Sequence, residues 1–341
     1  MTKEEIKAAL LSLSPTERAT LYAEIEASPE LHTSLLGKRR EQFNDKILNC
    51  PHCNGKKYRK HGLDKGSQRY YCNNCKRTFT EYTGTWICGL HKKELVIPYL
   101  KHVKAEDSLD DIKDNLKINK KTALDWRHKL LTGLETTDQG SFTGITESDE
   151  TFFLISEKGK QQDSREPRKR GGVATKKGIS DEQVAVIVTA DRKSELDMTL
   201  ATLGRIKKID IDEAIGQRVS SETILCSDGH VSYKGFAIDK QLEHHALRAN
   251  LKEYIRGHYH IQHVNSIDNK LKKWIDYQFW GVSTKYLQKY LNWFKTKEKL
   301  KKSKDFFKEF TEKTLLDTST RERYFKTNEI YMKLICNAKL N

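Results

Sequence analysis

The sequence predicts a multidomain α+β protein, with small N-terminal modules followed by a larger domain of mixed strands and helices. Two Cys-x-x-Cys pairs lie in the first quarter of the chain, a spacing typical of a small metal-bound ribbon. Between residues 90 and 135 the apolar residues recur at helical spacing. After residue 142, β-rich runs give way to helical patterns. The length of 341 residues is enough for two or three such domains.

The composition indicates a soluble, basic protein with a polyanionic partner. The chain has 36% apolar and 32% charged residues, and its 62 Lys and Arg against 47 Asp and Glu give a net charge of +15. A protein that neutralises phosphates releases counterions and gains affinity without reading bases. Charge alone does not distinguish DNA from RNA or a membrane surface. No apolar run approaches the roughly 18 residues of a transmembrane helix, so we expect no membrane partner.

Residues 1–45 are expected to form a helical arm. Ile6, Leu10 and Leu13 share one helix face, and the Ser-Pro-Thr-Glu segment at 14–17 is typical of a second helix start. The opening segment is acidic and amphipathic and has no signal-peptide pattern. We therefore expect a reducing, cytoplasmic setting.

The cysteine pairs predict a zinc ribbon over residues 46–82. Each pair places two thiolates on one tight turn, and residues 54–71 suffice for a hairpin that brings four sulfurs to one tetrahedral ion. Two disulfides are the alternative, which a reducing setting disfavours. We do not expect His52 to be a ligand, because four thiolates complete the shell. Lysines and arginines surround the ribbon and form either a nucleic-acid contact or a solvated face. The predicted zinc ligands are Cys50, Cys53, Cys72 and Cys75.

Residues 90–135 have the layout of a helix-turn-helix. Ser108 and an acidic first turn start one helix, and residues 116–119 break it before another helix that begins at Lys120. In such a unit the last helix lies in the DNA major groove. Helix pairs without this role are common, but the neighbouring basic ribbon favours DNA binding. The groove-facing candidates are Lys120, Lys121, Thr122, Asp125 and Arg127.

The sequence pattern of residues 142–295 predicts a mixed α/β domain with two acidic residues on strands. Asp149 stands in the middle of a strand, and Asp228 ends an apolar strand at a glycine turn. Ligands of α/β sheets gather at such strand ends. If the strands are neighbours the two carboxylates converge, which like charges tolerate mainly around hard divalent cations. Glu147 shares the strand face of Asp149 and is a candidate for supporting it.

Two further features accompany these carboxylates. A helix after residue 262 would place Asn265, Asp268 and Lys272 on one polar, metal-competent face at i, i+3 and i+7. A basic, glycine-containing loop at residues 157–180 is too polar to bury and joins two strands. It either clamps DNA or is a solvated hairpin tip, and its contact candidates are Lys169 and Arg170.

Together these motifs resemble the transposases of the insertion-sequence 1595 family. The resemblance covers most of the chain and rests on the ribbon, the helix-turn-helix and four segments: Glu-Ser-Asp-Glu-Thr-Phe at 147–152, Ser-Asp-Gly at 227–229, His-Val-Asn-Ser-Ile-Asp at 263–268 and Phe-Trp-Gly-Val-Ser-Thr-Lys-Tyr-Leu at 279–287.

The resemblance implies a ribonuclease-H-like core in which two aspartates and a third polar residue bind two magnesium or manganese ions. It implies Asp149 and Asp228 as the first and second ligands. The third position stays open between Asn265, which with Lys272 matches the pattern of some members, and Asp268, the better hard-cation ligand.

The activity that the resemblance implies is that of a DNA transposase. Such an enzyme binds the terminal inverted repeats of an insertion sequence and catalyses magnesium-dependent cleavage and strand transfer. Double-stranded DNA, as element ends and target, is the expected partner, and joining two ends implies a homodimer or larger oligomer at the bacterial nucleoid. The alternatives are a catalytically inactive, transposase-derived DNA-binding regulator and a metal nuclease acting on RNA. Residues 296–341 are expected to form a basic helical segment. Its lysine-rich part, residues 295–313, is either a basic amphipathic helix against DNA or a solvated helix with one buried face.

Overall fold

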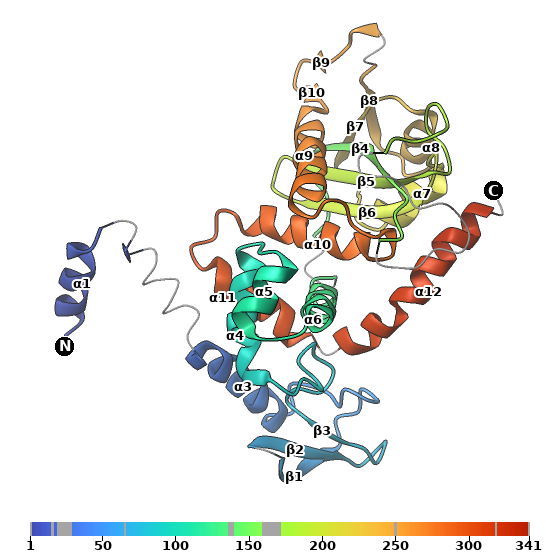
Figure 1. The fold of residues 1–341 in the computed structure, drawn as a ribbon. Helices are drawn as coiled ribbons and strands as arrows, with labels where there is room; N and C mark the ends of the chain where they lie inside the picture. The colour runs from blue at the N-terminus through green and yellow to red at the C-terminus, as the bar shows by residue number, and fades with distance from the viewer. Residues whose placement is uncertain are drawn as a thin grey trace. The chain divides into compact units, whose positions relative to one another are not determined.

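The computed structural model describes residues 2–14, 17–18, 29–64, 66–135, 140–158, 172–248, 251–317 and 319–339. The chain divides into two compact units (Figure 1). One unit comprises residues 1–133 and 302–322, and the other comprises residues 134–301 and 323–341. No helix among the described residues is long and apolar enough to cross a membrane.

The first unit contains a three-stranded antiparallel ribbon with its own aromatic core. The helices α1 (Lys3–Ser12) and α3 (Pro29–Asn44) come first in the chain. The strands of the ribbon are β1 (Tyr58–Asp64), β2 (Ser67–Cys72) and β3 (Thr78–Thr80). Phe43 of α3 packs against Tyr58, Tyr70 and Phe79 with ring centroids 5.2–6.0 Å apart. The Tyr58 hydroxyl donates to the Phe43 carbonyl at 2.9 Å. Because so small a ribbon cannot bury a large core, α3 supplies part of it.

Three helices follow the ribbon in the same unit. Ser108 caps the second of them, since its Oγ accepts from Asp111 N at 3.1 Å while an Asp111 carboxylate oxygen accepts from Ser108 N at 3.3 Å. Lys117 ends that helix in the left-handed region with φ 51°, and Asn119 caps the next. A short 3₁₀ turn, η1 (Lys93–Leu95), precedes the three, which are α4 (Val96–Lys104), α5 (Leu109–Leu116) and α6 (Lys120–Thr132).

Helix α11 (Phe306–Leu316) returns the chain to the first unit, where it packs against α3 and α6. Phe307 and Phe310 are buried there, so these aromatic residues of the lysine-rich C-terminal stretch are core side chains. Helix α11 therefore has a buried apolar face.

The second unit is built on a five-stranded sheet of order β6-β5-β4-β7-β8. β5 is antiparallel to both of its neighbours, while β4, β7 and β8 run parallel to one another. The strands are β4 (Gly144–Leu154), β5 (Gln183–Asp191), β6 (Leu196–Leu203), β7 (Thr223–Ser227) and β8 (Glu243–Ala246).

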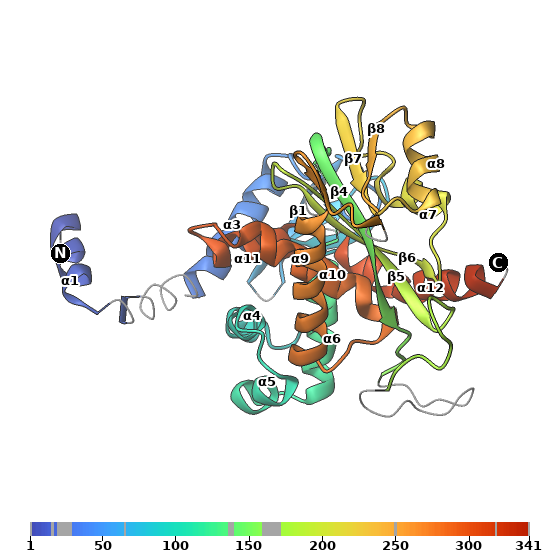
Figure 2. The same cartoon turned by 90° about the horizontal axis from the view of Figure 1, so that it is seen from above.

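Helices cover the two faces of this sheet (Figure 2). Successive β4 side chains alternate between the faces. On one face, Ser148 hydrogen-bonds Thr189 of β5 at 2.8 Å and Tyr233 of α8 at 3.4 Å. On the other face, the Glu147 carboxylate accepts from the backbone of α9. The helices are α7 (Lys208–Ile215) and α8 (Val231–Asp239) on the first face, α9 (Gln262–Lys273) on the second, the π-helical turn η3 (Trp274–Gln278), α10 (Thr284–Leu300) along β6, and α12 (Thr320–Lys339).

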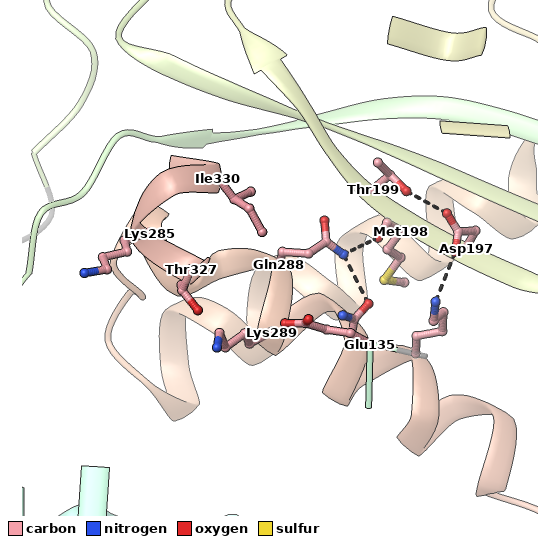
Figure 3. A pocket seen from close by; sticks show the side chains of 11 residues that line it. Glu135, Asp197, Met198, Thr199, Lys285, Gln288, Lys289, Thr327 and Ile330 are labelled. Atoms are coloured by element: carbon pink, nitrogen blue, oxygen red, sulfur yellow. Dashed lines mark hydrogen bonds and ion pairs between the residues drawn. The ribbon is translucent and has the colours of Figure 1, made fainter. Parts of the chain in front are cut away.

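A cavity of about 270 Å³ lies where α10 meets the edge strand β6 (Figure 3). The Gln288 amide accepts from Leu200 N at 2.8 Å and donates to the Met198 carbonyl at 2.9 Å. Gln288 therefore satisfies edge groups that a further strand would otherwise pair. Beside it, buried Asp197 forms ion pairs with Lys295 at 3.1 Å and Arg218 at 2.9 Å. This polar layer fixes α10 against the sheet.

Candidate active site

Three carboxylates converge where β7 ends beside the central strand β4. Asp149, Glu150 and Asp228 offer oxygens that all lie within 4.8 Å of one another. β4 and β7 are parallel neighbours in which Glu147 is paired with Cys226, so Asp149 and Asp228 each follow that pair by two residues. The structure thus brings together the two aspartates singled out from the sequence and adds Glu150.

Backbone groups orient the two aspartates. One Asp149 carboxylate oxygen accepts from Glu150 N at 2.9 Å, and one from Asp228 accepts from His230 N at 2.8 Å. Gly229, between Asp228 and His230 in the chain, has φ +87°, and a Cβ there would meet Ala246 Cβ at 3.2 Å. A glycine is therefore required for the turn that presents Asp228.

Burial and mutual repulsion raise the pKa values of these carboxylates. Burial raises the pKa of Asp149 to about 6, and the Asp228 charge adds to it. Burial together with the Asp149 and Asp228 charges raises the pKa of Glu150 to about 8. Burial, then the Asp149 charge, raises the pKa of Asp268 to about 8. So many close carboxylates favour an arrangement with bound cations.

The arrangement of oxygens fits hard divalent cations. Glu150 Oε2 and Asp268 Oδ1 are buried and have no hydrogen-bond partner within the described part of the chain. A buried carboxylate oxygen without a donor is costly, and a metal ion satisfies it as well as a hydrogen bond would. The acidic group could therefore bind a catalytic metal.

Helix α9 turns one of the two alternative third residues inward. Asp268 is 7% exposed and interacts electrostatically with Asp149. Asn265, one turn earlier, is exposed to solvent. Lys272, one turn later, is exposed too, and its charge lowers the pKa of both Asp149 and Asp268. Of the two, Asp268 is the residue that lies beside the acidic cluster.

Glu147 holds α9 in this position. Its fully buried carboxylate accepts from His263 N at 2.9 Å and Val264 N at 3.3 Å, two amides of the first turn of α9. Arg192 donates to the same carboxylate at 3.0 Å and forms an ion pair with it at 2.8 Å. An anion at a helix N-terminus is stabilised by the unpaired amides and the helix dipole. The clamp fixes α9 against β4, the strand of Asp149.

The same clamp brings two imidazoles close to Glu147. His260 and His263 have ring nitrogens within 4.8 Å of its carboxylate. However, Arg192 already neutralises this carboxylate, and an Arg192 nitrogen lies 3.1 Å from His260 Nε2. A cation would have to displace that guanidinium, so we interpret this group as structural.

The four cysteine sulfurs form a separate cluster in the first unit. Cys50 Sγ lies 3.8 Å from Cys75 Sγ, Cys53 Sγ lies 3.6 Å from Cys72 Sγ, and all four lie within 4.8 Å of one another. A tetrahedral ion with bonds of about 2.3 Å to sulfur requires sulfur–sulfur edges of about 3.8 Å. A disulfide requires about 2.05 Å. The cluster could bind zinc, and the disulfide alternative does not fit.

The two cysteine turns have the same backbone geometry. The residue after each pair is left-handed, with φ 58° at Asn54 and 57° at Lys76. Asn54 N donates to the Cys50 carbonyl at 2.8 Å, and Lys76 N donates to the Cys72 carbonyl at 3.0 Å. His52 lies outside the cluster, with Nε2 3.1 Å from the Thr78 carbonyl.

The predicted groove-facing residues of α6 do not all face solvent. Lys120 and Lys121 are exposed, Lys120 in an ion pair with Asp110 at 2.7 Å, and Thr122 is half-buried. Arg127 is 3% exposed and donates to the Asp107 carbonyl at 2.7 Å. The prediction that Arg127 faces outward is therefore wrong, because it follows buried Ala123 by one helical turn. Two other predicted contacts, Lys169 and Arg170, lie outside the described residues.

Glu150 has no role that the sequence alone predicts. Strand alternation places it on the opposite face from Asp149, and so it was not expected to join the same cluster. The signal was the pair of adjacent acidic residues at the point where a neighbouring strand ends.

Comparison with known proteins gives two matches. Residues 141–298 match a family described as the ISXO2-like transposase domain. The chain is also 23% identical over 259 residues to the "Uncharacterized protein in transposable element ISH50" of Halobacterium salinarum, a match that spans 74% of this chain and 85% of that protein. All the acidic-cluster residues and the Glu147 clamp lie in the region that matches the family.

Proposed function

We propose, since this chain belongs to the ISXO2-like transposases of the insertion-sequence 1595 family, that it binds the terminal inverted repeats of its element and cuts and joins DNA there with divalent metal ions. The observation that carries this proposal is the convergence of Asp149, Glu150 and Asp228, with buried Asp268 beside them. The proposed partner is double-stranded DNA, bound by a homodimer or larger oligomer at the nucleoid.

The fold supports a ribonuclease-H-like core. In the second unit three strands form an antiparallel meander, and two more are added parallel to the first, giving the order β6-β5-β4-β7-β8. The acidic residues come from the first strand, the end of the fourth strand and a helix after the fifth. This is the distribution that the family resemblance implies for its two aspartates and third polar residue.

The chemistry proposed is phosphodiester hydrolysis and transfer. Asp149, Glu150, Asp228 and Asp268 would hold magnesium or manganese ions, which when bound activate the attacking oxygen and stabilise the leaving oxygen of an in-line displacement. Lys272, next to these carboxylates, is placed to attract the phosphate. Glu147 keeps α9, and with it Asp268, at a fixed distance from β4. The exposed surface of α6 and the basic ribbon, with structural zinc at its four cysteines, would bind the element ends.

A cutting assay tests the function directly. The purified protein is incubated with a duplex carrying its own terminal repeats, with magnesium or with EDTA, and with a matched RNA duplex. Magnesium-dependent cuts at the repeat ends of the DNA are the expected result. Specific binding without any cut would instead support the DNA-binding regulator, and cutting of RNA alone would support the RNA nuclease.

Asp268→Asn and Asn265→Ala distinguish the two alternative third ligands. We expect Asp268→Asn to slow cutting about 10- to 100-fold and to raise the magnesium concentration needed, because it removes a buried anionic oxygen next to Asp149. Asn265→Ala is expected to change the rate by no more than about twofold, as for an exposed side chain. Magnesium titrations of the cutting rate measure both. The opposite ranking would make Asn265 the ligand.

A further inference from the structure

An exposed apolar segment lies directly before α9 in the second unit. Leu251, Tyr254 and Ile255 are 59%, 59% and 55% exposed. Single apolar side chains on a surface are ordinary, but three large ones within five residues form a patch that favours a partner. We call residues 251–256 the β9 segment.

The hairpin that carries this segment is anchored at its other strand. β9 (Ile255–Arg256) pairs antiparallel with β10 (Tyr259–His260), and Gly257 has φ +60°, as a tight two-residue turn requires. The Tyr259 ring stacks on His245 of β8 with centroids 3.6 Å apart and planes 11° apart. The hairpin is therefore held through β10, while the β9 segment faces solvent.

The anchored strand connects the hairpin to the acidic cluster. β10 leads within two residues into α9, which carries Asp268. Figure 1 shows β9 and β10 beyond the amino end of α9. Arg192, which pairs with Glu147, also donates to the His258 carbonyl at 3.3 Å. The hairpin is therefore linked to the acidic cluster through α9 and through the Arg192–Glu147 pair.

The charge on the hairpin indicates what kind of partner this is. Between residues 248 and 260 there are three Lys or Arg residues and two histidines, and Glu253 is the only acidic residue. Arg256 forms an ion pair with Glu253 at 3.3 Å, and Lys252 is exposed. Aromatic and aliphatic side chains interleaved with cations are the combination that binds unstacked nucleotides, whose bases stack while the backbone is attracted electrostatically.

We propose that the β9 segment takes up an unstacked base next to the cleaved phosphate, with Tyr254 stacking on it. This inference rests on the proposed function, since it assumes that DNA is cut at the acidic cluster. A paired, stacked duplex presents its phosphates at the outside of a stiff helix, and opening one or two base pairs lets the strand bend into a site. Tyr254 compensates for the stacking that the opened base loses.

The test compares cutting of two substrates. One is the fully paired element end, and the other has the two base pairs that flank the cleaved bond replaced by mismatches. We expect Tyr254→Ala to slow cutting of the paired substrate by about tenfold, as for the loss of one base–aromatic stack, and to cut the mismatched substrate at nearly the wild-type rate. Tyr254→Phe, which keeps the ring, is expected to cut both substrates normally.

Tyr277→Ala is the matched control. Tyr277, like Tyr254, is an exposed tyrosine, at 73%, but it lies in η3 after the carboxyl end of α9, whereas the β9 segment precedes the amino end. We expect Tyr277→Ala to cut both substrates at the wild-type rate. Equal rates of Tyr254→Ala and wild type on the paired substrate, or a defect that mismatches do not relieve, would overturn the inference. So would a Tyr254→Ala protein that, without DNA, has a smaller mass in light scattering than the wild type, because the segment would then bind a second copy. If the wild type cuts neither substrate, the proposed function itself fails.

Discussion

Asp149→Ala is expected to abolish metal-dependent cutting and joining while specific binding to the element ends persists. Asp149 belongs to the cluster with Glu150 and Asp228, and its charge interacts with those of Asp228 and Asp268. Its loss should reduce the cutting rate by at least about 10²–10³-fold, the effect of removing one preorganised charge interaction at a reacting centre. Rates are measured on labelled duplexes with magnesium, and binding is measured by fluorescence anisotropy in EDTA.

The stability of the Asp149→Ala protein separates this loss from unfolding. Burial and the Asp228 charge raise the pKa of Asp149 to about 6, so the folded state disfavours the ionised form relative to the unfolded chain. Above pH 6 that ionised form destabilises the fold, and its removal should leave the metal-free melting temperature unchanged or higher. Asp239→Ala, which removes an exposed α8 carboxylate paired with Lys208, is the control with normal activity. Strand transfer at the wild-type rate by Asp149→Ala would contradict the proposed site.

Cys72→Ser is expected to release zinc and unfold the ribbon, with loss of sequence-specific DNA binding. The free energy of structural zinc binding, about 10–16 kcal/mol, is comparable with or larger than the whole stability of a small domain, about 5–15 kcal/mol. The ribbon core of Phe43, Tyr58, Tyr70 and Phe79 is too small to replace it. Zinc content by atomic emission, amide NMR spectra and the anisotropy of labelled repeat DNA follow the three effects.

Cys88→Ser provides the matched control for the zinc ligands. Cys88 lies in the same unit but outside the four-cysteine cluster, so we expect one bound zinc and normal DNA binding after its substitution. A full equivalent of zinc in the Cys72→Ser protein would contradict the assignment. So would wild-type protein that contains no zinc when it is purified without chelators.

The cysteine cluster and the pair of aspartates could be predicted because their signals are local. Two Cys-x-x-Cys turns specify a tetrahedral site almost by spacing alone, and the sulfur separations fit it. Asp149 and Asp228 each stand on a recognisable strand, and only the assumption that the strands are neighbours was needed. The capping sequence at Ser108 likewise marks the start of α5.

The parts that could not be predicted depend on contacts between distant residues. Whether Asn265 or Asp268 turns inward depends on how α9 is rotated, and that rotation is fixed by Glu147, more than 110 residues earlier in the chain. Arg127 is a residue type that often contacts DNA, but here it is buried and donates to the Asp107 carbonyl, just before α5 begins. The two-residue strands β9 and β10 are too short to have a periodic pattern.

Gln288 has a consequence for contacts between copies of this protein. Open sheet edges are templates on which a second chain adds its own strand, and the hazard grows with local concentration. At β6 the Gln288 amide already occupies Leu200 N and the Met198 carbonyl. Two copies of this chain are therefore prevented from extending the sheet through these two backbone groups of β6.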